Sequence, residues 1–391
     1  MDYLTFIRRT MPQHFRTQEL QFLVSGNDRL IRESILQDVV RSCREREERL
    51  MIVDDTGAAA SVYPEILRSF GYQAVNGMSG EFCLYQPFQL TTVKGISKIR
   101  QMLATLEYNE KQKGKLLSYL GFIRHVETLR HGGRDFELDP GTLAEYSTVI
   151  AAEEKLQELA EAGILDARQQ RLLLAKYAEC ASAAADFEDM LYILYPFIHG
   201  RDIRTEVLRN QALIFPTGEL GEDETIRSLV MQLLQFGLEE DRSCRITLLI
   251  LDKGYGSRRC VLNLLKAVPP HVQMHIFSED IFTLCDAATL AMVLNRFAVR
   301  VYSRHLAMSS AEAIEKACGE IDVVKTTYDV TYDRRWRSNR PWDILLGNNK
   351  TETYGTAPPE REPKYRREMI MSFPPGNGIV EFMGNTSVFS F

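Results

Sequence analysis

The sequence predicts an α/β protein with a mainly parallel β-sheet, helices on both faces of that sheet, and an all-α insertion that interrupts it. Short apolar runs alternate with helical segments in residues 1–92 and again from residue 207 onward. Continuously apolar strands are typical of parallel sheets that are covered on both faces. Between these two parts, the chain has helical periodicity and no strand pattern. This order predicts one α/β domain split by a helical insertion.

The first half of the α/β domain, residues 1–92, alternates strands and helices. Apolar runs predict three strands, at Glu19–Ser25, Leu50–Val53 and Tyr72–Val75. Apolar residues at helical spacing predict two helices, at Leu30–Arg49 and Val62–Phe70.

Residues 93–206 are predicted to form the all-α insertion domain. Its helices are expected at Ile96–Leu120, Gly121–Leu129, Pro140–Ala162, Asp166–Cys180 and Ala183–Leu194. Asp139 and Asp166 precede two of these helices and are suitable N-caps. The insertion is long enough to be a domain.

Residues 207–327 return to the α/β pattern and form the second half of the domain. Strands are predicted at Gln211–Phe215, Arg245–Leu251, Val272–Phe277 and Val299–Tyr302. Helices are predicted at Asp223–Gly237, Ser257–Ala267, Ala287–Phe297 and Ser310–Gly319. Residues 328–391 are polar, aromatic and rich in Pro and Gly, which predicts an extended C-terminal arm. Within it, Gly378–Gly384 is expected to be a hairpin or edge strand.

Composition excludes several classes of protein. The 391 residues contain 47 Lys and Arg against 53 Asp and Glu, which gives a net charge of −6. The molecule as a whole is therefore not expected to attract DNA or an anionic membrane. The seven cysteines contain no CxxC pair, and we predict no metal site. No signal peptide or apolar span of ~20 residues is present, so no integral membrane segment is expected.

The turn after the first strand lies where an α/β protein would carry a phosphate-binding loop. Such a loop needs GxxxxGK[ST], in which glycines expose backbone N–H groups, the lysine neutralises charge and the hydroxyl holds magnesium. Gly26 keeps the first position, whereas Ile31, Arg32 and Glu33 occupy those of the second glycine, the lysine and the hydroxyl. Glu33 would repel phosphate. We therefore expect any nucleotide site at this turn to be degenerate.

Two further strand ends carry acidic residues. Asp252 ends the strongest apolar strand, where a Walker B aspartate would hold the water shell of Mg²⁺. The catalytic base expected next is replaced by Lys253, which cannot deprotonate water at ordinary pH unless its pKa is strongly lowered. Asp54 and Asp55 follow the second strand. Asp54, Asp252 and Lys253 thus join Gly26 and the loop residues in the predicted degenerate site.

The order of these segments resembles that of the type IV coupling proteins, the TraG/TraD-type motors among the HerA/FtsK-like P-loop ATPases. The resemblance extends from about Gln21 to the end of the chain and includes the helical insertion. The matching segments are Met51–Gly57, Gly71–Val75, Gln86–Phe88, Leu294–Phe297, Cys318–Glu320, Pro363–Met369 and Phe373–Ile379. The sensor segment, Ile276–Asp280, lacks the family's glutamine.

The resemblance implies a P-loop NTPase-like fold, that of a RecA-like ATPase domain, and a role in conjugative DNA transfer or type IV secretion. Two departures modify that expectation. The family usually starts with membrane helices, and we expect none in this chain. The nucleotide motifs also differ from the family at three places: the loop residues 31–33, Lys253 and the sensor segment. We therefore expect a pseudo-ATPase that acts as a scaffold or adaptor, with no ATP hydrolysis and no cofactor. Expected partners are an active coupling ATPase or other secretion and conjugation proteins.

Two alternatives remain open. In the first, the chain is an active DNA-translocating ATPase with an atypical site, in which Arg32 binds phosphate and Asp252 binds Mg²⁺; ATP and Mg²⁺ would then be its cofactors. In the second, Asp54, Asp55 and Asp252 converge on a metal for nuclease chemistry.

A basic segment near the C-terminus is a candidate for nucleic-acid contacts. Arg334, Arg335, Trp336 and Arg337 combine cations with an aromatic ring, as single-strand grooves do. A solvated basic face is the simpler explanation, so DNA binding remains open. We expect a cytoplasmic protein, with peripheral association at the inner face of the membrane as an alternative.

Overall fold

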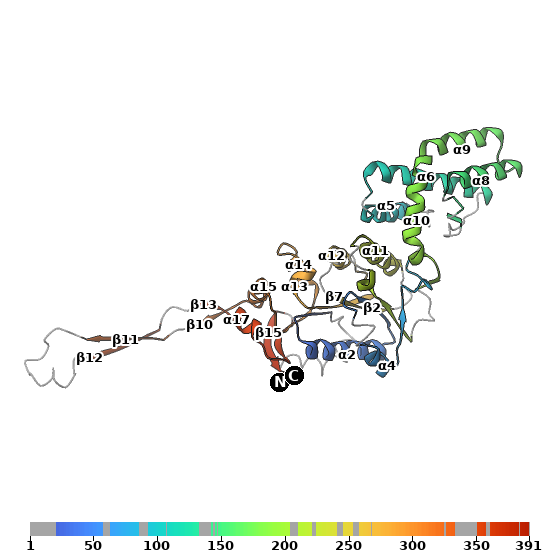
Figure 1. Ribbon diagram of the computed structural model, residues 1–391. Helices are drawn as coiled ribbons and strands as arrows, with labels where there is room; N and C mark the ends of the chain where they lie inside the picture. Colours follow the sequence, from blue (N-terminus) through green and yellow to red (C-terminus); the bar gives the residue numbers. More distant parts are fainter. Residues whose placement is uncertain are drawn as a thin grey trace, which may run out of the picture.

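A nine-stranded, mainly parallel sheet forms the centre of the molecule (Figure 1). The computed structural model describes residues 21–57, 63–85, 93–106, 108–132, 142–143, 145–146, 148–203, 210–220, 224–240, 245–252, 258–266, 268–323, 326–332, 350–356, 360–382 and 384–390. The strands of the central sheet are β1 (Phe22–Ser25), β2 (Arg49–Asp54), β3 (Gln73–Asn76), β6 (Gln211–Phe215), β7 (Ile246–Asp252), β8 (Val272–Ser278), β9 (Val299–Tyr302), β14 (Asn377–Phe382) and β15 (Asn385–Ser390).

The spatial order of the strands is β15-β14-β9-β1-β8-β7-β2-β6-β3. The seven strands from β9 to β3 pair in parallel, and β14 joins β9 and β15 in antiparallel pairs. The central strands β1, β2, β7 and β8 are buried along their whole length. The parallel pairing confirms the predicted sheet. The burial of these strands explains their continuous apolar runs, because a strand is buried along its whole length only where helices cover both faces of the sheet.

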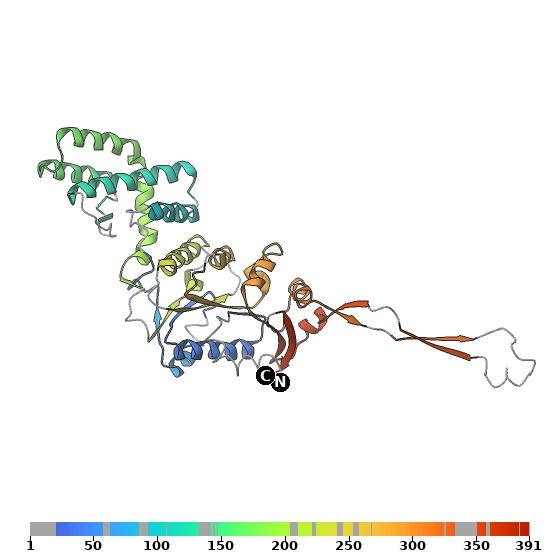
Figure 2. The same cartoon turned by 180° about the vertical axis from the view of Figure 1, so that it is seen from behind.

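Helices cover both faces of the sheet (Figures 1 and 2). On one face lie α2 (Arg29–Glu45) and α4 (Pro64–Ser69). On the other lie α11 (Glu224–Glu240), α12 (Arg258–Lys266), α13 (Ile281–Leu284), α14 (Leu290–Arg296) and α15 (Met308–Cys318). Alternate strand residues enter the two cores, as β1 illustrates: Phe22 and Val24 pack with α2, and Leu23 packs on the opposite side.

The insertion is helical, as predicted. Its helices are α5 (Val93–Thr105), α6 (Glu110–Arg130), α8 (Val149–Glu161), α9 (Ala167–Cys180) and α10 (Ala184–Ile198), with a 3₁₀ turn, η1 (Ala181–Ala183), before α10. The helix predicted for Ile96–Leu120 is broken, because Asn109 and Gln112 form a capping box that starts α6. Conversely, α6 continues through Gly121, where a break was expected. Asp166 caps α9 as predicted, whereas Asp139 lies outside the described residues.

The insertion shares a core with one face of the sheet. Buried residues of α6, α9 and α10 belong to the same cluster as Leu23, Met51 and Leu248 of the sheet. At the junction, the Nζ of Lys98 in α5 lies 2.6 Å from the Oε1 of Glu240 in α11. A short parallel pair that the sequence did not predict, β4 (Phe82–Cys83) with β5 (Arg201–Asp202), joins the segments that enter and leave the insertion. The predicted domain boundaries remain predictions.

The region predicted as an arm, residues 328–391, divides into two parts, and the first part includes strands that start before residue 328. β10 (Glu320–Val323) pairs with β13 (Glu360–Pro363), and β11 (Thr326–Tyr332) pairs with β12 (Lys350–Thr356); these two antiparallel ribbons project from the body (Figures 1 and 2).

The chain then returns through α17 (Arg367–Met371), where the N–H of Arg367 donates to Glu315 of α15 at 2.6 Å. It ends in the β14–β15 hairpin. The hairpin or edge strand predicted at Gly378–Gly384 is therefore present, but it completes the central sheet and is not part of an arm.

Among the described residues, no helix is both long and apolar enough to cross a membrane.

Candidate functional site

The carboxyl ends of the parallel strands meet at one edge of the sheet, which is the usual ligand edge of an α/β fold. The registers bring predicted site residues together there. Ser25 at the end of β1 pairs with Ser278 of β8, and Ser278 pairs with Asp252 of β7. Asp54 lies one strand further along, opposite Leu251. The structure therefore places Gly26, Asp54 and Asp252 at the same edge, as the sequence order required.

The turn after β1 is tightly enclosed. Gly26 has φ +122°, and a Cβ at this position would lie 2.2 Å from the Oγ of Ser303 and 3.0 Å from the carbonyl oxygen of Arg304. Its N–H donates to the carbonyl of Ser278 at 3.0 Å, and the N–H of Asn27 donates to the carbonyl of Arg304 at 2.9 Å. Gly26 is required because only glycine combines this backbone conformation with so close an approach. The turn is thus fixed between the ends of β8 and β9.

Asp28 fills the N-terminus of α2. Its Oδ1 accepts a hydrogen bond from the N–H of Ile31 at 3.2 Å, which makes it the N-cap of the helix. Its Oδ2 accepts from the N–H of Gly376, just before β14, at 2.6 Å. The residue is only 8% exposed. A helix N-terminus is a natural anion site, and here the protein's own carboxylate occupies it.

Sequence reasoning missed Asp28. A signal was present, since an aspartate directly before an apolar helical run is an N-cap pattern. Its contact with Gly376, 348 residues away, had no sequence signal.

The residues in the positions of the P-loop lysine and hydroxyl lie inside α2. Only Gly26, Asn27 and Asp28 separate β1 from α2, so positions 31–33 are helical. Ile31 is fully buried in the core. The Nη1 of Arg32 lies 3.6 Å from the Oε1 of Glu279 in the sensor segment. Glu33 pairs with Arg29 across one helical turn at 2.5 Å.

Asp252 is part of a hydroxyl network. Its Oδ2 accepts from the Oγ1 of Thr283 at 2.6 Å and from the Oγ of Ser278 at 3.3 Å, and only 1% of the residue is exposed. Asp280 caps α13 and accepts from the Oγ of Ser310. Hydroxyl groups of the protein therefore donate hydrogen bonds to the carboxylates of Asp252 and Asp280.

A buried histidine, His305, follows β9 and contacts the end of β1 at this edge of the sheet. The Oγ of Ser25 lies 2.8 Å from the Nε2 of His305, whose Nδ1 lies 2.8 Å from the carbonyl oxygen of Ser303. Burial lowers the pKa of His305. The neutral ring therefore donates from Nδ1 to the carbonyl and accepts from Ser25, and its position makes it a structural element of the turn.

The carboxylates after β2 bind other partners. The Oδ1 of Asp54 accepts from the N–H of Thr56 at 2.9 Å and from its Oγ1 at 2.7 Å. The Oδ1 of Asp55 lies 3.2 Å from the Nη1 of Arg227 in α11. Within the described part of the chain, no group of three His, Cys, Asp or Glu residues could hold a metal ion. The convergence of Asp54, Asp55 and Asp252 proposed for a nuclease is therefore not found there.

Two predicted sets of residues lie outside the described structure. Lys253 follows β7 directly, and Arg334, Arg335, Trp336 and Arg337 lie between β11 and β12. Their roles stay predictions.

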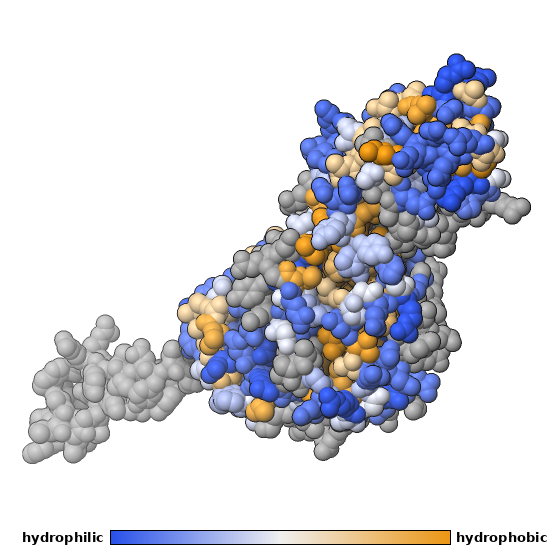
Figure 3. All heavy atoms as spheres, turned by 45° about the vertical axis from the view of Figure 1, so that its right-hand side comes forward, coloured by the Kyte–Doolittle hydropathy of each residue, from blue (hydrophilic) through white to orange (hydrophobic). Residues whose placement is uncertain are grey.

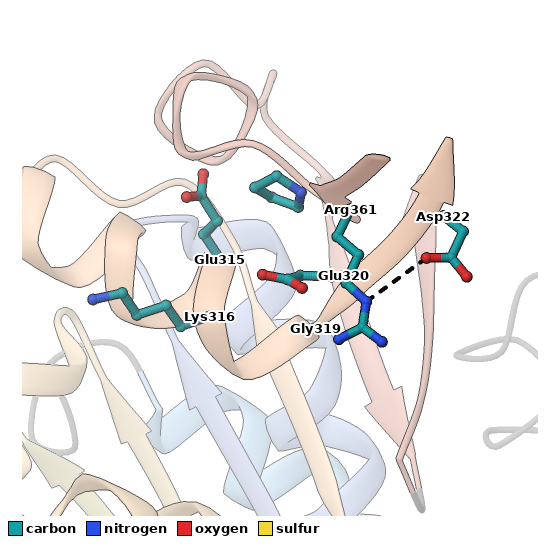
Figure 4. A pocket seen from close by; sticks show the side chains of 7 residues that line it. Glu315, Lys316, Gly319, Glu320, Asp322 and Arg361 are labelled. Atoms are coloured by element: carbon teal, nitrogen blue, oxygen red, sulfur yellow. Dashed lines mark ion pairs between the residues drawn. The ribbon is translucent and has the colours of Figure 1, made fainter. Parts of the chain in front are cut away.

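A hollow lies at the root of the projecting ribbons, between α15 and the β10–β13 pair. It has a volume of about 630 Å³, and Glu315, Glu320 and Arg361 are among its lining residues. Figure 4 shows Arg361 directed toward Asp322, whose Oδ1 lies 3.8 Å from the Nε, while Lys316 extends away from Asp322. None of the described residues that line this hollow was predicted for the nucleotide site.

Comparison with known proteins identifies the fold. No protein-family model matches the sequence, and a search of curated proteins gave no match. The unbound bacterial conjugative coupling protein TrwB is similar in structure, with 14% identity and a TM-score of 0.55 over 94% of this chain and 83% of that one. TrwB in complex with ADP and Mg²⁺ has a TM-score of 0.53 over the same shares of the two chains. VirB4 of Thermoanaerobacter pseudethanolicus is similar over 95% of this chain and 88% of that one, with 14% identity and a TM-score of 0.52. The chain thus has the P-loop NTPase-like fold of these proteins, and the resemblance to the type IV coupling proteins is confirmed at the level of the fold.

Proposed function

We propose that the chain is a coupling-protein-like component of a conjugative DNA-transfer or type IV secretion apparatus, acting as a scaffold or adaptor without hydrolysing ATP. The shared fold supports the first half of this proposal, since its structural neighbours are a conjugative coupling protein and VirB4. The geometry at the carboxyl edge of the sheet supports the second half.

The observation that carries the proposal is the position of the Asp28 carboxylate. A phosphate would need the free N–H groups at the start of α2, and Asp28 accepts from Ile31 and Gly376 at that point. A phosphate placed there would also meet the negative charge of this carboxylate. The three-residue turn before α2 leaves no loop to wrap around a phosphate chain. TrwB has been described in complex with ADP and Mg²⁺, so the fold itself accepts nucleotide.

The magnesium side of the site supports the same conclusion. A Walker B aspartate must reach the water shell of the ion. Asp252 is buried and accepts hydrogen bonds from two hydroxyls. Binding of a hydrated ion would require these contacts to be rearranged.

A nucleotide titration tests the proposal. A fluorescent ATP analogue, with and without Mg²⁺, is added to the full chain, and TrwB serves as the positive control. We expect no saturable binding up to millimolar nucleotide and no Mg²⁺-dependent hydrolysis. An ATPase rate that disappears in Asp252→Ala would overturn the proposal. Micromolar ATP affinity that falls in Arg32→Ala would instead support the alternative of an active motor with an atypical site.

The adaptor role needs a second measurement. The full chain, immobilised by an affinity tag, is mixed with a purified full-length coupling ATPase at physiological salt. We expect the two proteins to be retained together, and the absence of retention at micromolar concentrations would count against this role.

A further inference from the structure

The helical insertion carries an open groove on its outer part. The groove lies between α8 and α9, has a volume of about 650 Å³, and is lined by α8 residues that include Glu153 and Glu161 and by Leu174 of α9. In Figures 1 and 2 these two helices lie on the side of the insertion away from the central sheet. The groove is therefore separate from the carboxyl edge described above.

The floor of the groove combines apolar and polar residues. Ala160, Gln157 and the nearly buried Leu156 line it from α8, and Gln170 and Leu174, the latter 40% exposed, line it from α9. Ile150 is 69% exposed and lies on the same side of α8 as Glu153, because residues three and seven positions apart share a helix face. Figure 3 shows apolar patches at the surface of the insertion among hydrophilic side chains. Clustered exposed apolar side chains of this kind mark interaction surfaces.

The rim of the groove along α8 is acidic. Glu153 and Glu161 line it and lie eight residues apart, about 12 Å along the helix axis. The lysine of α8, Lys155, is paired: its Nζ lies 3.0 Å from the Oε2 of Glu145 and 3.3 Å from the Oε2 of Glu158. The basic residues of α9 are exposed and lie outside the described lining. They are Arg168, Arg171 and Lys176.

We propose that the α8–α9 groove binds an amphipathic α-helix of a partner protein. The apolar stripe of that helix packs on Ala160 and Leu174, and its Lys or Arg side chains face Glu153 and Glu161. An apolar stripe in a groove with complementary charge at the edge is a recurrent mode of peptide recognition. The acidic rim disfavours nucleic acid, because carboxylates repel phosphates. The proposal holds whether or not the carboxyl edge of the sheet binds nucleotide.

The test measures the binding of synthetic helical peptides to the full chain. A fluorescein-labelled 14-residue peptide of Leu and Lys, with Leu at helical i, i+3, i+4 and i+7 positions, is compared with a peptide in which Glu replaces every Lys. Anisotropy is recorded at 150 mM salt. We expect saturable binding of the Lys peptide and at least tenfold weaker binding of the Glu peptide.

Variants of the chain separate groove binding from general attraction to an acidic protein. Glu153→Lys combined with Glu161→Lys should weaken binding of the Lys peptide at least tenfold. The matched control, Glu188→Lys with Asp189→Lys on α10, changes the net charge equally at exposed positions outside the groove and should leave affinity within twofold.

The apolar contact at Leu174 is tested by Leu174→Glu, which should also weaken binding at least tenfold. Its matched control is Tyr192→Glu, at a position on α10 that is 84% exposed. Circular dichroism confirms that each variant keeps its helices. Equal losses in the groove and control variants would overturn the proposal, as would displacement of the Lys peptide from the groove by a single-stranded oligonucleotide.

Discussion

Removing the Asp28 carboxylate is expected to destabilise the α/β domain more than the loss of an ordinary helix cap. In Asp28→Ala, the N–H of Ile31 loses its capping acceptor, which costs about 1 kcal/mol. The buried N–H of Gly376 also loses its partner, which costs about 1–3 kcal/mol. The free energy of unfolding should therefore fall by about 2–4 kcal/mol.

Two further variants isolate these contributions. Asp28→Asn keeps one carbonyl oxygen for the cap, but its amide nitrogen cannot accept from Gly376, so an intermediate loss is expected. Asp166→Ala removes an exposed N-cap with no second long-range contact and should cost about 1 kcal/mol.

The assay combines urea unfolding, followed by circular dichroism, with native-state hydrogen exchange. Unfolding gives the loss for each variant, and exchange reports the amide of Gly376 directly. That amide should lose protection in Asp28→Ala and Asp28→Asn and keep it in Asp166→Ala. The reasoning is refuted if Asp28→Ala costs no more than Asp166→Ala while the Gly376 amide stays protected.

Three further perturbations have expected outcomes. Gly26→Ala should lower the free energy of unfolding by about 2 kcal/mol or more, because the turn requires φ +122° and offers no room for a Cβ; an unchanged urea midpoint would contradict the described turn. Burial lowers the pKa of His275 to about 3, so below pH 6.5 the unfolded state takes up a proton that the folded state refuses. Stability contributed by this neutral histidine should be complete above about pH 6.5 and fall by about 2 kcal/mol by pH 5, and His275→Gln should flatten that slope in urea titrations at several pH values. If the basic segment contacts single-stranded DNA, replacing Arg334, Arg335 and Arg337 by Ala should weaken binding and reduce the salt slope by about 2; an unchanged slope would remove these residues from the interface.

Local signals in the sequence predicted most of the central sheet. The run from Ile246 to Leu251 is apolar at every position except Thr247, and it forms the fully buried strand β7 within one residue of the predicted range. Helix ends were less predictable because they depend on caps. Asn109 starts α6 with a capping box, and Gly121 does not interrupt this helix because one glycine costs only about 1 kcal/mol.

Contacts between distant parts of the chain account for what was missed. Nothing near Gly378 indicated that its strand would pair with Val299–Tyr302, because strand pairing depends on the whole sheet. At the candidate site, strand order placed Gly26 and Asp252 at the same edge. The occupation of the helix start by Asp28 was not predicted, because its second partner lies far away in the sequence, just before the last hairpin.

The hydrogen bond between Asp28 and Gly376 can form only after nearly the whole chain has been synthesised. The two residues are 348 positions apart, and ribosomes add about 5–20 residues per second, so α2 emerges roughly half a minute before its final partner. Throughout that interval the Asp28 carboxylate has only the cap as a partner, and in its last part, once β9 has been made, the edge of β9 has no β14 beside it. A nascent chain stalled between β9 and residue 376 would therefore expose an open strand edge, which is a target for chaperones and a hazard for aggregation.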